Sequence, residues 1–151
     1  MVRVTSAVLA ALAFSTNAFA SLGGTVSSVE TDRVRTQSAL IRIQRVDGYS
    51  VHEMQSPTGT TIREFYGSDG VVFGVAWDGE WTPDLRQLLG SYFDQYTRST
   101  TEARRKGASH HRVAVNENGL VVHATGHLHS TYGVAYAPAL LPAGVTPAVV
   151  R

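Results

Sequence analysis

Apolar and polar side chains alternate in residues 41–44, where two isoleucines alternate with an arginine and a glutamine. A period of two residues is typical of a β-strand with one buried face. Asp47-Gly48 follows, and this dipeptide strongly favours a two-residue hairpin turn. The pattern therefore predicts a strand from Leu40, a tight turn and a return strand over residues 49 to about 55.

Two more strands are predicted before the middle of the chain. Residues 60–66 lie between two groups of turn-forming residues, which are rich in glycine, proline, serine and aspartate. Residues 71–77 have apolar or small side chains at every position. Such a run is typical of a strand with both faces covered, so we predict that it lies in the centre of a sheet.

One amphipathic helix is predicted next. Thr82 is a favourable N-cap, Pro83 suits the first helical position, and Gly107 can end the helix. Apolar side chains recur at helical spacing in one stripe, made of Leu85, Leu88, Leu89, Tyr92, Phe93 and Tyr96. The strand residues expected to pack against this stripe are Val71, Phe73 and Val75.

Three strands are predicted after the helix, over residues 111–115, 120 to about 129, and 131–137. The sequence Asn-Glu-Asn-Gly at residues 116–119 predicts the first turn between them. From Pro138 the chain is rich in alanine and proline and is expected to be extended, with a further edge strand over residues 146–150. The whole pattern predicts an α+β fold, with a curled antiparallel sheet of about six or seven strands packed on one helix.

The first twenty residues have the pattern of a cleaved signal peptide. Arg3 supplies a positive charge, residues 4–14 are apolar, and Ala18-Phe19-Ala20 is a small-x-small cleavage site. The apolar run is shorter than the about 20 residues that a transmembrane helix needs. We therefore expect cleavage after Ala20, export to the periplasm or the medium, and no membrane span in the mature chain.

The remaining chain is predicted to form one domain. Residues 21–39 are polar and form an N-terminal arm, while residues 40–151 form the α+β domain with its Ala/Pro-rich tail. Ser27 and Glu30 have the spacing of a helix capping box, so the arm either begins a short helix or is flexible.

Composition narrows the possible partners. The 151 residues include 13 basic and 12 acidic side chains and no cysteine. Without Arg3 the formal charge is balanced, which argues against nucleic acid as a partner. An exported chain without cysteine has no disulfides and depends on its core for stability.

Three histidines form the candidate metal site. His123, His127 and His129 share a parity, so on one unbroken strand they would project from the same face. Imidazoles so placed can bind a transition metal when a further ligand joins them, and His52, His110 and His111 are the candidates for that ligand. The alternative is that the three are polar residues on the solvated face of a sheet, in a strand that Gly126 could interrupt.

The loop before the helix is a second candidate site. Asp78 and Glu80 lie between Trp77 and Trp81, and Asp84 follows. Carboxylates beside aromatic rings are typical of glycan sites. The alternative is that the acids are solvated turn residues, with Trp77 in the core and Trp81 beside the helix start. We keep Trp81, Asp78 and Glu80 as candidate contacts for a ligand or partner.

Other catalytic motifs are missing from the sequence. It has no Gly-x-Ser-x-Gly or Ser-x-x-Lys sequence and no glycine-rich phosphate loop, so we name no catalytic residue and no cofactor. Arg63 and Glu64 are neighbours on a predicted strand and face opposite sides. We interpret Arg63 as an ordinary surface charge, and the alternative is a buried arginine that meets a partner such as Asp84.

Several segments together resemble a known family, and they are residues 22–24, 63–65, 70–77, 83–85, 88–93, 133–136 and 140–145. The family consists of short exported proteobacterial proteins and is catalogued as a domain of unknown function, number twenty-eight forty-four. The resemblance covers nearly the whole mature chain. It implies an exported single domain and carries no activity or site residues.

Three functional hypotheses follow. The leading one is an exported, non-enzymatic protein that binds an unidentified protein or small ligand, in a pocket between sheet and helix. The second is a metal- or carboxylate-dependent hydrolase, which requires the histidines or the acids to converge in a cleft. The third is a structural protein of the cell envelope that uses its tail or an open sheet edge.

Overall fold

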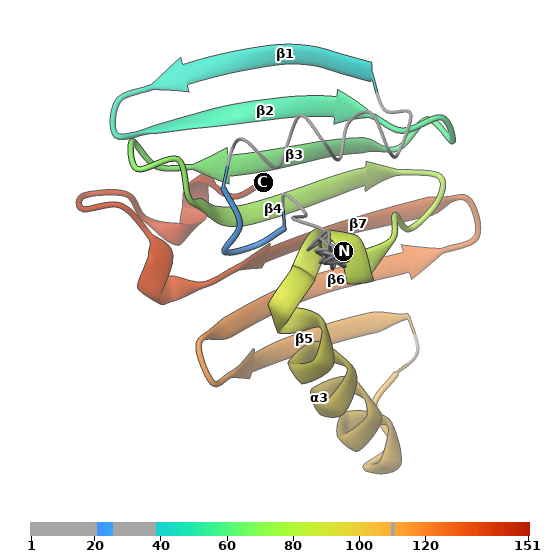
Figure 1. The fold of residues 1–151 in the computed structure, drawn as a ribbon. Coiled ribbons are helices and arrows are strands. Elements are labelled where there is room, and N and C mark those ends of the chain that lie inside the picture. Colours follow the sequence, from blue (N-terminus) through green and yellow to red (C-terminus); the bar gives the residue numbers. More distant parts are fainter. Residues whose placement is uncertain (1–20, 26–38, 110) are drawn as a thin grey trace, which may run out of the picture.

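The computed structural model of the protein describes residues 21–25, 39–109 and 111–151. The predicted signal peptide, the capping box at Ser27 and Glu30, and His110 lie outside these residues. Seven antiparallel strands form one open sheet (Figure 1). In chain order they are β1 (Ala39–Val46), β2 (Tyr49–Gln55), β3 (Thr61–Tyr66), β4 (Val72–Gly79), β5 (Arg112–Glu117), β6 (Leu120–His127) and β7 (Ser130–Tyr136).

The order of the strands across the sheet is β1-β2-β3-β4-β7-β6-β5. Each half of the sheet is a meander of neighbouring hairpins, and the two halves meet where β4 pairs with β7. This places β4 in the middle of the sheet and β1 and β5 at its two edges (Figure 1). The α+β class, the antiparallel sheet and the central position of β4 are therefore confirmed.

Two-residue turns join the hairpins where glycine permits the required backbone. Asp47-Gly48 connects β1 to β2, as predicted. Asn118 and Gly119 connect β5 to β6 with φ angles of 47° and 80°. Because this turn needs a positive φ at both positions, it consists of Asn118-Gly119 alone, and β5 continues to Glu117. The predicted strand end at residue 115 is therefore too early.

The helical segment has three parts, α2 (Leu85–Leu89), the 3-10 turn η1 (Gly90–Tyr92) and α3 (Phe93–Arg105). Asp84 is the N-cap, and its carboxylate accepts hydrogen bonds from the backbone N–H groups of Arg86 and Gln87 at 2.9 and 3.2 Å. The prediction of Thr82 as the cap is wrong by two residues. A charged carboxylate can satisfy two free donors at once, so the helix begins after Asp84.

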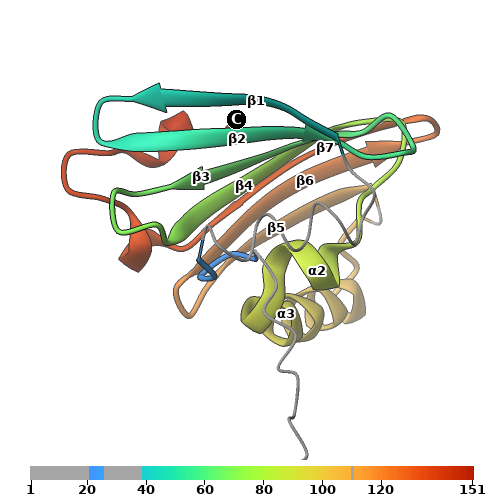
Figure 2. The same cartoon turned by 45° about the horizontal axis from the view of Figure 1, so that its top comes forward.

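Two apolar cores lie on opposite faces of the sheet. Figure 2 shows α2 and α3 on one face, which we call the helix face. There Leu88 and Leu89 pack with Val75, while Trp77 belongs to the same buried cluster. The burial predicted for Trp77 is confirmed, and Leu85, Phe93 and Tyr96 are partly buried beside it.

Phe73 lies on the opposite face, which we call the tail face. A bulge in the pairing of β3 with β4, between Phe65 and Tyr66, breaks the alternation near Phe73. Phe73 consequently packs with Phe65, Ala76 and Val150 and not against the helix. The prediction that Phe73 packs against the apolar stripe of the helix is therefore wrong.

The C-terminal segment covers part of the tail face with two 3-10 turns, η2 (Pro138–Leu140) and η3 (Pro147–Val149). It is neither extended throughout nor an additional edge strand, as the sequence had suggested. Proline lacks the N–H group that a sheet ladder needs, and each turn has proline at its start. Val150 is buried, and its side chain lies in the space left by Gly74 on β4.

The described part of the N-terminal arm is held in the fold. Ser21 and Leu22 are buried, and the backbone N–H of Leu22 donates to the carbonyl of Leu88 at 3.0 Å. Thr25 forms an isolated β-bridge with Val71. None of the helices in the described part of the chain has the length and apolar character that a bilayer crossing requires.

Candidate functional site

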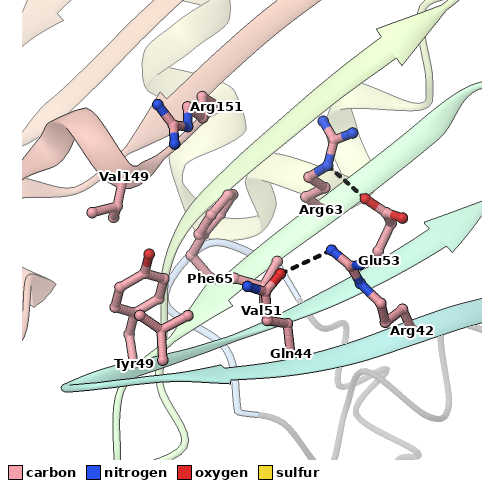
Figure 3. Close-up of a pocket in the computed structure, with 10 residues that line it drawn as sticks. Arg42, Gln44, Tyr49, Val51, Glu53, Arg63, Phe65, Val149 and Arg151 are labelled. Carbon is pink, nitrogen blue, oxygen red and sulfur yellow. Dashed lines mark hydrogen bonds and ion pairs between the residues drawn. The ribbon is translucent and has the colours of Figure 1, made fainter.

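A groove lies on the tail face, between β1–β3 and the end of the C-terminal segment (Figure 3). Its volume is about 360 Å³, which is in the range of small-molecule sites. Its lining residues are Arg42, Gln44, Val46, Tyr49, Val51, Glu53, Arg63, Phe65, Val149 and Arg151. The pocket that the sequence predicts between sheet and helix has a counterpart in a smaller hollow of about 250 Å³, which lies between α3 and β5 and is lined by residues that include Thr100, Ala103 and Val113. The larger groove is on the other face.

The strand register orders the floor of the groove into three cross-strand rows. From one end to the other they are Arg42–Glu53–Arg63, Gln44–Val51–Phe65 and Val46–Tyr49. Successive rows are two residues apart along each strand, or about 7 Å. The groove therefore changes from charged side chains at one end to apolar side chains at the other.

The charged row consists of two guanidinium groups on either side of one carboxylate. Arg63 Nε donates to Glu53 Oε2 at 2.8 Å, and the two side chains are 31% and 23% exposed. Arg42 Nη2 donates to the side-chain oxygen of Gln44 at 2.9 Å. Arg63 is thus part of a half-buried ion pair, which corrects its interpretation as an ordinary surface charge.

The two terminal nitrogens of Arg63 have no protein partner among the described residues, because its only hydrogen bond uses Nε. Figure 3 shows them directed away from Glu53. A guanidinium group with two free N–H edges can bind an oxyanion in bidentate fashion. The ion pair holds Arg63 in place and leaves this capacity unused.

Val46, Tyr49 and Val149 form the apolar end of the groove, where the Tyr49 ring packs on the buried rings of Phe65 and Phe73. The Tyr49 ring lies 6.4 Å from the Phe65 ring and 6.2 Å from the Phe73 ring, measured between centroids. Val149 completes this end from the C-terminal segment, and Arg151 stands beside it (Figure 3). Because the rings pack on one another, this end is a firm apolar surface.

The three candidate histidines are dispersed along the β6–β7 hairpin. His123 lies within β6, His127 is its last residue, and His129 is in the turn with a φ angle of 57°. The premise of one unbroken strand is therefore wrong, because the two-residue turn of Leu128 and His129 ends the alternation. His129 instead contacts Trp81 edge-on, with 5.5 Å between ring centroids.

The further histidines do not complete a metal site in the described part of the chain. His111 stacks on His127, with ring centroids 5.7 Å apart. His52 is buried on the helix face, where its Nε2 lies 2.9 Å from the Tyr66 hydroxyl. Over residues 21–25, 39–109 and 111–151, no three His, Cys, Asp or Glu side chains form a group that could hold a metal ion.

Two residues of the acidic loop, Asp84 and Trp81, form hydrogen bonds that stabilise the fold. Asp78 and Glu80 are exposed, and the carboxylate of Asp84 caps α2. Trp81 is 53% exposed, and its backbone carbonyl accepts a hydrogen bond from Thr60 Oγ1 at 2.7 Å. Trp81 is therefore available for contact, and its loop is held by Thr60, the residue that precedes β3.

Sequence reasoning missed the groove because it combines four separate segments, namely the three strands of its rows and the C-terminal segment. The polar positions Arg42 and Gln44 were visible as one side of an alternating strand. Glu53 and Arg63 are neighbours only because of the register in which β2 pairs with β3, and this register is not visible in the sequence. No pattern in the sequence indicates that Val149 and Arg151, from the C-terminal segment, line the groove.

The open seven-stranded sheet, with a helix on one face and a groove on the other, defines an α+β protein with a concave surface site. A family model described as "Protein of unknown function (DUF2844)" matches residues 18–150. The chain belongs to this family, as its sequence resemblance implied. No curated protein and no solved structure matches the chain.

Proposed function

We propose that the protein is an exported, non-enzymatic binding protein that holds a small ligand in the groove of the tail face. The observation that carries the proposal is the groove itself, which has a volume of about 360 Å³ and side chains of mixed polarity. Binding sites typically combine an apolar surface with a few oriented polar groups. The rows of β1–β3 provide both.

Export is the second part of the proposal. Its support is the sequence of the first twenty residues, with a basic start, a short apolar run and the Ala-Phe-Ala site. The intact mass of the protein in the periplasmic fraction tests this directly. A mass that begins at Ser21 is expected, and retention of the full chain in the cytoplasm would contradict it.

Two neighbouring residues on the edge strand allow a clean test of the groove. Gln44 lines the groove, whereas Ile43 is exposed on the other face of β1. We expect Gln44→Trp to weaken binding of the neutral dye Nile red at least tenfold by filling the groove. Ile43→Trp should bind as the wild type does, because the added ring lies outside the groove. Fluorescence titration measures both.

The stability of the two variants is the control. Both positions are exposed, so each substitution should change the free energy of unfolding by no more than about 0.5 kcal/mol. If the two tryptophan variants bind the dye equally, or if wild-type protein does not bind it, the groove is not the binding site.

A further inference from the structure

We infer that the ligand of the groove is an amphipathic anion, with an oxyanion head on the charged row and an apolar body along the other two rows. This inference rests on the proposed function of the groove and adds the chemical class of its ligand. The inference is based on the order of the three rows and on the terminal nitrogens of Arg63, which form no hydrogen bond with the described residues.

The charged end favours an anion. The row of Arg42, Glu53 and Arg63 has one positive charge in excess. Glu53 fixes Arg63 through Nε alone, at 2.8 Å, so the terminal nitrogens remain free to donate. Two N–H groups of a guanidinium match two oxygens of a carboxylate or sulfate, which makes such a contact stronger than one between neutral groups.

The other end favours an apolar body. Val51 and Phe65 form the middle row, and Val46 and Tyr49 form the last row, about 14 Å from the charged row along the strands. The only polar side chain in these two rows besides the tyrosine hydroxyl is Gln44, which is bonded to Arg42. An extended ligand about 14 Å long would contact the guanidinium groups with its head and Val51, Tyr49 and Val46 with its tail.

Three probes with the same tail and different heads test the inference. Decanoate, decanol and decyltrimethylammonium are titrated into the purified protein by calorimetry, at concentrations below micelle formation. Decanoate should bind at least tenfold more tightly than decanol, and the cation should bind most weakly. The preference for decanoate should fall as salt is added, because the arginines at the rim are partly exposed.

Two substitutions in the charged row should act in opposite directions. Arg63→Gln should weaken decanoate binding about tenfold or more and leave decanol unchanged. Glu53→Gln removes the negative charge between the arginines, so it should strengthen decanoate binding. A residue that only supports the fold would not produce this gain. Arg98→Gln, at an exposed position on α3, is the matched control and should have no effect.

The outcomes of these titrations distinguish a failure of the inference from a failure of the proposed function on which it rests. Equal binding of decanoate and decanol would keep the groove as a ligand site and overturn the anionic head. Binding of none of the three probes, together with no binding of Nile red, would overturn the proposed function itself. Binding to phosphatidylglycerol vesicles without binding of free decanoate would assign the arginines to a membrane surface and also overturn the inference.

Discussion

The close contact between Gly133 and Trp77 shows how one missing side chain shapes the core. The two residues pair across β7 and β4, and Trp77 is almost completely buried. A Cβ atom at position 133 would overlap the indole ring of Trp77. The ring therefore occupies space that only glycine leaves open, and this fixes its orientation on the helix face.

Substitution of this glycine tests the contact. Gly133→Ala should lower the free energy of unfolding by about 2 to 3 kcal/mol, because the indole must move within a packed core. Gly126→Ala on the adjacent strand β6 is the control, since its Cβ would meet only the Thr131 methyl group, at 3.9 Å. Urea unfolding measures both. Equal losses would show that glycine is needed for backbone reasons and not for the ring.

At the scale of single elements, the sequence predicted most of the structure. Strands and helix were visible because their periods of two and 3.6 residues are local properties of the chain. The cap and the bulge were not visible in the same way. Both Thr82 and Asp84 are good caps, and the bulge that turns Phe73 to the tail face depends on how β3 pairs with β4.

The start of α2 provides a test at this scale. Asp84→Ala should lower the free energy of unfolding by about 1 kcal/mol, because two backbone donors lose their acceptor. Thr82→Ala should have no measurable effect, since Thr82 is exposed and lies before the cap. Thermal or urea unfolding distinguishes them. A larger loss of unfolding free energy for Thr82→Ala would show that Thr82 is the N-cap, as the sequence predicts.

At the scale of the whole molecule, the candidate site was beyond prediction. Its charged row needs the register of three strands, and its far wall comes from residues near the C-terminus. Alternation within a strand indicates which residues share a face, but not which strands are neighbours. The histidines and acids were proposed because they are close in sequence, whereas the groove is assembled from residues that are distant.

The C-terminal segment should therefore support both stability and binding. Val150→Ala should lower the free energy of unfolding by about 2 kcal/mol, because buried methyl groups beside Phe65 and Phe73 are lost. The substitution should also weaken Nile red binding, because the buried side chain of Val150 would no longer hold Val149 and Arg151 in position. Thr146→Ala, at an exposed position in the same segment, should change neither quantity. A stable Val150→Ala variant with normal binding would contradict this role.

The junction of β4 with β7 has a consequence for the order of folding. Hairpins within each meander close short loops, whereas the β4–β7 pair must close a loop that contains the helix and two further strands. Closing a long loop costs more entropy, so we expect this pairing to form after the hairpins within each meander. In the native sheet this pair covers the inner edge of each meander, so neither of these edges is open to another strand.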